Sequence, residues 1–290
     1  MSDFKFRPLK GLLSLNNNNF KSISVFNALQ SVEERLSPSP NGRAKKLMLF
    51  FIIINELNKV NIPFYVKGGT ILQYYLDDHA RATNDLDVIV PGDSDSFFEN
   101  TKRALEAYDK DIIFEVKEYI KKPAYDKYFY NTFSFKIYVY HEKEMIDSFI
   151  LEGIYGDVFE KINPVSYDGP SIIEENFAYL GVRVEYIFAE KILAITSELE
   201  RPIKHLVDAY SLSKIDINID LLKYYLEVIL EEEKKARIKY SYPLDKYKYV
   251  IKSDKNFIGN YVFTILQSGY NEDKDDVVNY LNDWMKDKNL

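Results

Sequence analysis

The residues best suited to chemistry lie in two short motifs. The first is Lys67-Gly68-Gly69-Thr70, which follows a short apolar stretch. Glycine lets the backbone adopt positive φ and approach an anion closely, and the first N–H groups of a following helix point toward that anion. The motif therefore predicts a strand, a phosphate-binding turn and a helix that begins at Thr70, whose hydroxyl caps the helix or donates to a phosphate oxygen.

The second motif is a pair of aspartates, Asp85 and Asp87, at the start of an apolar run that ends at Val90. Alternate residues of a strand point to the same face, so both carboxylates project together. Paired carboxylates repel each other unless a cation or a proton lies between them. Mg²⁺, or Mn²⁺ in its place, prefers carboxylate and phosphate oxygens as ligands. The pair therefore predicts a metal site for displacement at phosphorus.

Each motif alone also has a purely structural explanation. A Gly-Gly pair between a strand and a helix is often only a turn, and Asp-x-Asp is common on protein surfaces. Their order along the chain favours a functional interpretation, namely an enzyme that handles a nucleoside triphosphate. Neither the P-loop sequence nor the dinucleotide-binding glycine fingerprint is present.

A third carboxylate is expected on a neighbouring strand, where it would share the metal or accept the proton of an attacking hydroxyl. Asp147 is the best candidate, because it lies between apolar residues in a predicted strand. Its alternative explanation is a solvated edge strand. Glu115 and Glu142 are weaker candidates for the same role.

The pattern of apolar residues predicts an α+β protein whose later part is almost entirely helical. The alternation in Phe129–Tyr140 has a clean period of two, as expected for a strand. The other expected strands are 64–66, 85–90, 112–120 and 145–151, and the expected helices are 20–36, 43–59, 70–78, 94–108, 185–198, 202–213, 220–237, 255–267 and 273–286. We therefore predict two domains, at residues 1–180 and 181–290.

Composition limits the possible function classes. The chain has 290 residues, no cysteine and a formal net charge of −7. The absence of cysteine excludes disulfides and thiolate metal sites, and suits a reducing cytoplasm. The negative charge argues against a broad basic face that binds nucleic acid nonspecifically. The apolar run Leu47–Ile54 is too short to cross a membrane and predicts a buried helix, and no secretory signal is evident.

Together these motifs resemble the nucleotidyltransferase superfamily with a polymerase-beta-like core, and specifically the AbiEii/AbiGii toxin family. The resemblance covers about half of the chain, from about Tyr65 to Leu212. One position departs from the family pattern, since His205 stands where an aspartate is usual. The matching segments are Lys67-Gly68-Gly69-Thr70, Arg81-Ala82-Thr83-Asn84-Asp85-Leu86-Asp87, Met145-Ile146-Asp147, Ala189-Glu190-Lys191-Ile192-Leu193-Ala194, Arg201 and Lys204-His205-Leu206-Val207-Asp208.

The resemblance implies a mixed-sheet nucleotidyltransferase core followed by a helical-bundle domain. It also implies that Asp147 completes a metal triad with the aspartate pair, and that Lys191 reaches the triphosphate. Asp208 would orient Lys191 or the nucleotide. Arg81 and Lys67 would contact phosphate or pair with carboxylates. For Lys191 and Asp208, a solvated helix lysine and a surface salt bridge are the alternatives.

Three hypotheses about function remain open from the sequence. The first is a Mg²⁺-dependent, cytoplasmic toxin or phage-defence enzyme that moves a nucleotide from an NTP to RNA, with tRNA as a possible acceptor and an antitoxin as partner. The second keeps this chemistry but has a small molecule or a protein as acceptor. The third is a nucleotide-binding module without activity, for which His205 is the only support.

Overall fold

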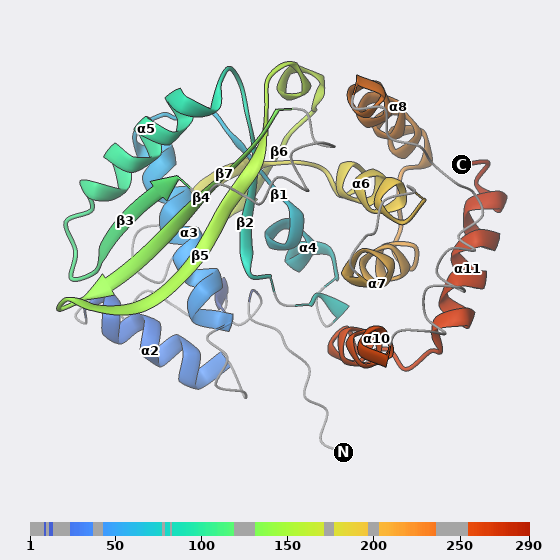
Figure 1. Ribbon diagram of the computed structural model, residues 1–290, viewed down its shortest axis with the longest axis horizontal. Helices are drawn as coiled ribbons and strands as arrows, with labels where there is room; N and C mark the ends of the chain where they lie inside the picture. The colour runs from blue at the N-terminus through green and yellow to red at the C-terminus, as the bar shows by residue number, and fades with distance from the viewer. Residues whose placement is uncertain are drawn as a thin grey trace. The chain divides into compact units, whose positions relative to one another are not determined.

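A computed structural model describes residues 9, 12–13, 24–36, 43–76, 79–81, 83–118, 131–170, 177–196, 203–235 and 255–290 (Figure 1). These residues form two compact units. The first contains the described residues of 1–74 and 82–182. The second contains those of 75–81 and 183–290, so the last residues of α4 and the short segment after it belong with the later helices. Among the described residues, no helix is both long enough and apolar enough to cross a membrane.

The first unit is built on one mixed sheet. Its strand order is β3-β4-β5-β2-β1-β7-β6, and the β2–β5 and β1–β7 pairs are parallel while the others are antiparallel. The two motifs lie on β1 and β2 near the centre of this sheet. The bounds of the strands are β1 Tyr65–Lys67, β2 Asp85–Val90, β3 Ile113–Glu118, β4 Thr132–His141, β5 Glu144–Tyr155, β6 Val165–Asp168 and β7 Ala178–Gly181.

One face of the sheet is buried by helices (Figure 1). Phe97 of α5 (Ser94–Glu106) packs on Phe133 of β4, and Phe50 of α3 (Arg43–Lys59) packs edge-on against Phe149 of β5. Tyr74 of α4 (Gly68–Leu76) packs against the β6–β7 end of the same face, and α2 (Val25–Leu36) lies against α3. The apolar run at the centre of α3 is buried, as predicted.

The opposite face carries the polar residues of the alternating strands, and we call it the open face. The short helix η3 (Asp157–Lys161) meets it at one end, where Phe159 stacks on Tyr65 with ring centroids 4.1 Å apart. On β4, Phe133, Phe135, Ile137 and Val139 are buried while the residues between them are partly exposed. This confirms the period of two, and it fixes which side chains share the face of Asp85 and Asp87.

The second unit is helical. Its helices are α6 (Val184–Thr196), α7 (Ile203–Leu212), α8 (Ile219–Lys235), α10 (Lys255–Gln267) and α11 (Lys274–Asp287). Helix α6 packs against both α7 and α8. It is buried almost all round rather than amphipathic, because neighbours cover it on several sides. This makes the position of its one lysine, Lys191, unusual.

The α+β class is confirmed, with a mixed sheet followed by helices. Two short strands, β6 and β7, were not predicted from the sequence. Helix α5 is capped by Asp93, whose carboxylate accepts from the Ser96 N–H over 2.8 Å.

Candidate active site

The glycine turn joins β1 to α4. Gly68 is the first residue of α4 and has a φ of +66°, which glycine adopts without strain. A side chain there would also overlap the Asp87 carboxylate, since a Cβ built on Gly68 would lie 2.7 Å from Cγ of Asp87. The predicted phosphate turn and the aspartate motif are therefore packed directly against each other.

The two residues after Gly68 fix the turn to its surroundings. A Cβ on Gly69 would lie 2.5 Å from Oγ1 of Thr83, and the Thr83 hydroxyl donates to the Asp85 carbonyl over 3.0 Å. Thr70 is fully buried, and its hydroxyl has no hydrogen-bond partner among the described residues. Because α4 begins at Gly68 and not at Thr70, the hydroxyl of Thr70 does not cap the helix. The N–H groups of the first turn, which lack intrahelical partners, remain the candidate for the predicted contact with phosphate.

Asp85 and Asp87 lie on the open face of β2. Both are partly exposed, whereas Leu86 and Val88 between and after them are buried on the other face. In the β1–β2 register Lys67 lies opposite Asp87. Opposed residues of neighbouring strands share a face, so a lysine stands beside the carboxylate pair.

Asp147 is not brought together with Asp85 and Asp87. In the parallel β2–β5 register Asp85 lies opposite Ile150, so the residues of β5 that share its face are an even number of positions from Ile150. Asp147 is three residues from Ile150, an odd number, so it points to the other face of the sheet, which the helices cover (Figure 1) and which we call the helical face. There it lies 3.9 Å from Nζ of Lys45 and 3.6 Å from Nζ of Lys46, both on α3.

The carboxylate that the register does bring to the aspartate pair is Glu152. It lies directly opposite Asp87 on the parallel neighbour β5 and shares the open face. Sequence reasoning missed it because the pairing of β2 with β5 is not visible in either strand alone. Neither weaker candidate takes this place: Glu115 is on β3 and pairs with Lys117, and Glu142 is in the β4–β5 turn with a φ of +47°.

The donor set fits a divalent metal of the magnesium type. Among the described residues no three His, Asp or Glu side chains are grouped closely enough to hold a metal by themselves. Magnesium is usually bound by one or two carboxylates together with substrate phosphates and water. Asp85 and Asp87, on one face beside a glycine turn, meet that requirement. Asp147 does not contribute, because it lies on the other face of the sheet.

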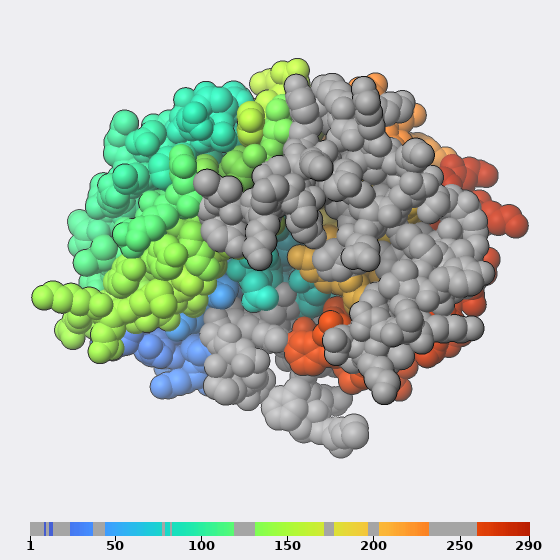
Figure 2. Space-filling model, in the orientation of Figure 1, coloured from blue at the N-terminus to red at the C-terminus, as the bar shows by residue number. Residues whose placement is uncertain are grey.

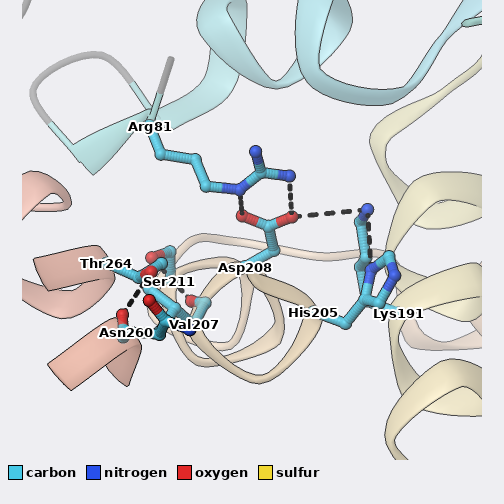
Figure 3. A network of polar contacts seen from close by, with 8 residues as sticks. All are labelled: Arg81, Lys191, His205, Val207, Asp208, Ser211, Asn260 and Thr264. Carbon is cyan, nitrogen blue, oxygen red and sulfur yellow. Dashed lines mark hydrogen bonds and ion pairs between the residues drawn. The ribbon is translucent and has the colours of Figure 1, made fainter. Parts of the chain in front are cut away.

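The second unit contains a buried cluster of charges (Figure 3). The guanidinium of Arg81 makes two hydrogen bonds to Asp208, with Nε 2.8 Å from Oδ1 and an Nη 2.9 Å from Oδ2. Nζ of Lys191, on α6, lies 3.3 Å from Oδ2 of the same carboxylate. The Lys191 and Asp208 side chains are only 8% and 2% exposed. Neither residue is therefore a solvated surface group.

Two cations share one carboxylate in this cluster. Burial alone would raise the pKa of Asp208, but Arg81 and Lys191 hold that pKa below its usual value. Burial lowers the pKa of the Lys191 ammonium, and the attraction of Asp208 offsets this only in part. Arg81 and Lys191 thus depend on one buried carboxylate for compensation of their charges where water is scarce.

His205 completes the cluster. Its Nδ1 lies 3.3 Å from Nζ of Lys191 (Figure 3). A lysine ammonium can only donate, so Nδ1 accepts and the ring proton is on Nε2 while Lys191 is charged. His205 is thus a second acceptor for Lys191, at the position where the resembling family usually has an aspartate. Arg201, which also belonged to that pattern, lies outside the described residues.

A mixed sheet that carries paired aspartates against a glycine turn, followed by helices with a buried lysine and aspartate, defines the nucleotidyltransferase class. The chain belongs to the AbiEii family: the family model described as "Nucleotidyl transferase AbiEii toxin, Type IV TA system" matches residues 55–287. The protein is therefore a nucleotidyltransferase of a toxin family.

The solved structures that resemble the chain include two of low sequence identity. One is the nucleotidyltransferase toxin MenT4 of Mycobacterium tuberculosis, with 11% identity, a TM-score of 0.49 and coverage of 85% of this chain and 94% of that chain. The other is an antigenic nucleotidyltransferase-like protein of Paracoccidioides brasiliensis, with 14% identity, a TM-score of 0.41 and coverage of 68% and 94%. No curated protein matches the chain.

Proposed function

We propose that this protein transfers a nucleoside monophosphate from an NTP to a hydroxyl group of RNA, with Mg²⁺ held by Asp85 and Asp87. The observation that carries the proposal is the direct packing of Gly68 on the Asp87 carboxylate. This packing supports the proposal, because the N-terminal end of α4 then lies beside the two carboxylates that we propose as metal ligands. A phosphate that binds this turn therefore also meets the aspartates.

Each residue of the candidate site has a role in the proposed reaction. The acceptor oxygen forms a bond to the α-phosphorus while the bond from that phosphorus to the leaving oxygen breaks, so that pyrophosphate departs. Glu152, opposite Asp87, takes the proton of the attacking hydroxyl. Lys191 supplies positive charge to the triphosphate, and Asp208 and His205 hold its ammonium in place. When bound, Mg²⁺ neutralises charge on the phosphates and on the leaving group.

Two further proposals follow from the family. A type IV toxin–antitoxin family suggests an antitoxin as a partner of this protein. We also propose that the protein acts in the cytoplasm, where both NTP and RNA are present. The absence of cysteine agrees with a reducing compartment.

The test is transfer of label from each α-labelled NTP to total RNA in the presence of Mg²⁺. We expect transfer by the wild type, and none by Asp85→Asn or Asp87→Asn. Asp109→Asn is the matched control, because Asp109 is exposed beyond the end of α5. Undiminished transfer by the Asp85→Asn variant would disprove the assigned site.

A specific observation favours a different acceptor from RNA. The net charge of −7 favours a small molecule or a protein over RNA. Label found only in a metabolite or in protein would decide for that alternative. Binding of Mg²⁺ and NTP without release of pyrophosphate, with any acceptor, would instead indicate a nucleotide-binding module without activity.

A further inference from the structure

The open face of the sheet carries two lysines and a tyrosine on β3 and β4. Lys117 on β3 lies directly opposite Lys136 on β4. Tyr138 is two residues further along β4 and therefore on the same face. We call these three residues the lysine–tyrosine row. None of them has a part in the chemistry proposed above.

The row is in register with the candidate metal site. Lys136 lies opposite Ile150 of β5, and Ile150 lies opposite Asp85 of β2. Asp85, Ile150, Lys136 and Lys117 thus form one line across four neighbouring strands, all on the open face. Strands are about 4.8 Å apart, so Lys136 is about 10 Å from Asp85 and Lys117 about 14 Å.

Among the described residues, only one of the two facing lysines has a carboxylate partner. Like charges directly opposite each other on neighbouring strands destabilise a sheet. Lys117 is 56% exposed and forms an ion pair of 2.9 Å with Glu115. The part of the chain that the structure describes gives Lys136 no such carboxylate partner. A bound phosphate would relieve the repulsion between the two lysines.

Tyr138 adds an aromatic surface between these charges. The ammonium groups of Lys117 and Lys136 lie 5.2 and 5.9 Å from the centroid of its ring. Tyr138 is itself partly exposed. An aromatic ring flanked by cations is the combination with which proteins bind single-stranded nucleic acid, because bases stack on the ring while phosphates meet the cations. Atoms of β4 and β5 lie on the side of the molecule shown in Figure 2, in green to yellow-green.

We propose that the lysine–tyrosine row binds the single-stranded 3′ end of the RNA acceptor. This inference rests on the proposed function, because the candidate metal site fixes the position of the terminal hydroxyl of the RNA. With the terminal hydroxyl at Asp85, the row lies about 10 Å upstream. That distance corresponds to roughly three stacked nucleotides at about 3.4 Å each. The last bases then stack on Tyr138 while the backbone passes the two lysines.

The first experiment measures binding without chemistry. Fluorescence anisotropy of a labelled single-stranded RNA is followed across a salt series for the wild type and for the double variant Lys117→Gln/Lys136→Gln. Loss of two phosphate contacts is expected to reduce the slope of log K against log salt by about 1.4, at about 0.7 per contact. The matched control is Lys102→Gln/Lys110→Gln, on and just after α5, which covers the other face. An unchanged slope in the first variant, or an equal change in the control, would overturn the inference.

The second experiment separates stacking from charge. Tyr138→Leu is expected to weaken binding of the single strand by roughly 5- to 100-fold, while Tyr138→Phe, which keeps the ring, retains it. A blunt RNA duplex should bind less tightly than the single strand, since its bases are not free to stack. Equal binding of the leucine and phenylalanine variants would contradict the stacking role.

The third experiment distinguishes this inference from the proposed function. In nucleotide transfer, the lysine double variant should raise the KM for RNA by tenfold or more and leave the KM for NTP unchanged. Normal transfer to RNA by the lysine double variant, with an unchanged KM for RNA, would disprove RNA binding by the lysine–tyrosine row but would leave the proposed function intact. Labelling of protein instead of RNA would overturn the row as an acceptor site but keep the transfer chemistry. If no acceptor is labelled, the proposed function fails, and the binding measurements still decide whether the row binds RNA.

Discussion

Gly68 and the carboxylate of Asp87 occupy adjoining space, so that any side chain at position 68 would overlap the aspartate. The positive φ of Gly68 imposes a second, independent requirement for glycine. Glycine is therefore required at position 68 both by the backbone conformation and by the neighbouring carboxylate. This joins the turn and the aspartate pair into a single feature of the first unit.

Gly68→Ala is expected to abolish nucleotide transfer and to lower the free energy of unfolding by about 1–3 kcal/mol, from backbone strain and displacement of Asp87. Gly92→Ala is the matched control. Gly92 has a φ of +72°, but a Cβ added there would have no atom within 4 Å, so its variant carries the strain without the overlap. It should lose about 1 kcal/mol and keep its activity. Thermal unfolding and the transfer assay check both; equal activity of the two variants would refute the role of the contact.

Glu152→Gln and Asp147→Asn should have opposite effects. Because Glu152 lies opposite Asp87 and Asp147 lies on the helical face, we expect the glutamine variant to lose most of its kcat. The asparagine variant should keep kcat and lose only a little stability with its ion pairs to α3. The measurement is kcat for transfer at saturating NTP. If Glu152→Gln kept its kcat and Asp147→Asn lost it, Asp147 rather than Glu152 would complete the site, as the family resemblance implies.

This contrast shows what the sequence could and could not predict. The shared face of Asp85 and Asp87 depends only on the period of a single strand, so it was accessible from the sequence. The choice between Asp147 and Glu152 depends on how β5 pairs with β2, and a shift by one residue moves every side chain to the other face. The partner of Arg81 could not be predicted from the sequence either, because Asp208 is far along the chain.

Local patterns also explain which elements were predicted. Helix α10 has the predicted bounds, and β4 was recognised from its alternation. The strands β6 and β7 have four residues each, which is too short for a periodic pattern to stand out. A helix was predicted at 185–198, but the burial of α6 on almost all sides follows from tertiary packing.

Asp208→Asn should destabilise the second unit strongly, by about 3–5 kcal/mol, because it leaves Arg81 and Lys191 buried without their carboxylate. The pKa of Asp208 is lowered in the folded protein. Its contribution to stability is therefore complete above its unfolded pKa of about 3.9 and is lost as the pH falls through the lower folded pKa. The difference in Tm between wild type and variant should be large at pH 7 and shrink below about pH 4. A constant difference across this range would contradict the assignment.

Lys191→Met should separate stability from activity. The pKa of Lys191 is lowered in the folded protein, so its charge costs stability below that folded pKa, and the cost disappears as the pH rises toward about 10.4. Methionine removes the charge but fills similar space. We expect a Tm at pH 7 no lower than that of the wild type, together with a loss of transfer. A marked fall in Tm would show that Lys191 is chiefly a structural partner of Asp208.

His205 is expected to position Lys191 through the contact between Nδ1 and Nζ. His205→Leu keeps the approximate volume but removes the acceptor, and should lower kcat by about 10- to 100-fold, the value of one hydrogen bond to a charged group. His205→Asn places an amide oxygen near the position of Nδ1 and should restore most of the activity. Ser211→Ala is the control on the same helix, because its hydroxyl donates to the Val207 carbonyl and not to Lys191 (Figure 3). The measurement is kcat and the KM for NTP of all three variants. If His205 were only a packing residue, the leucine variant would keep its kcat, and asparagine would offer no advantage over it.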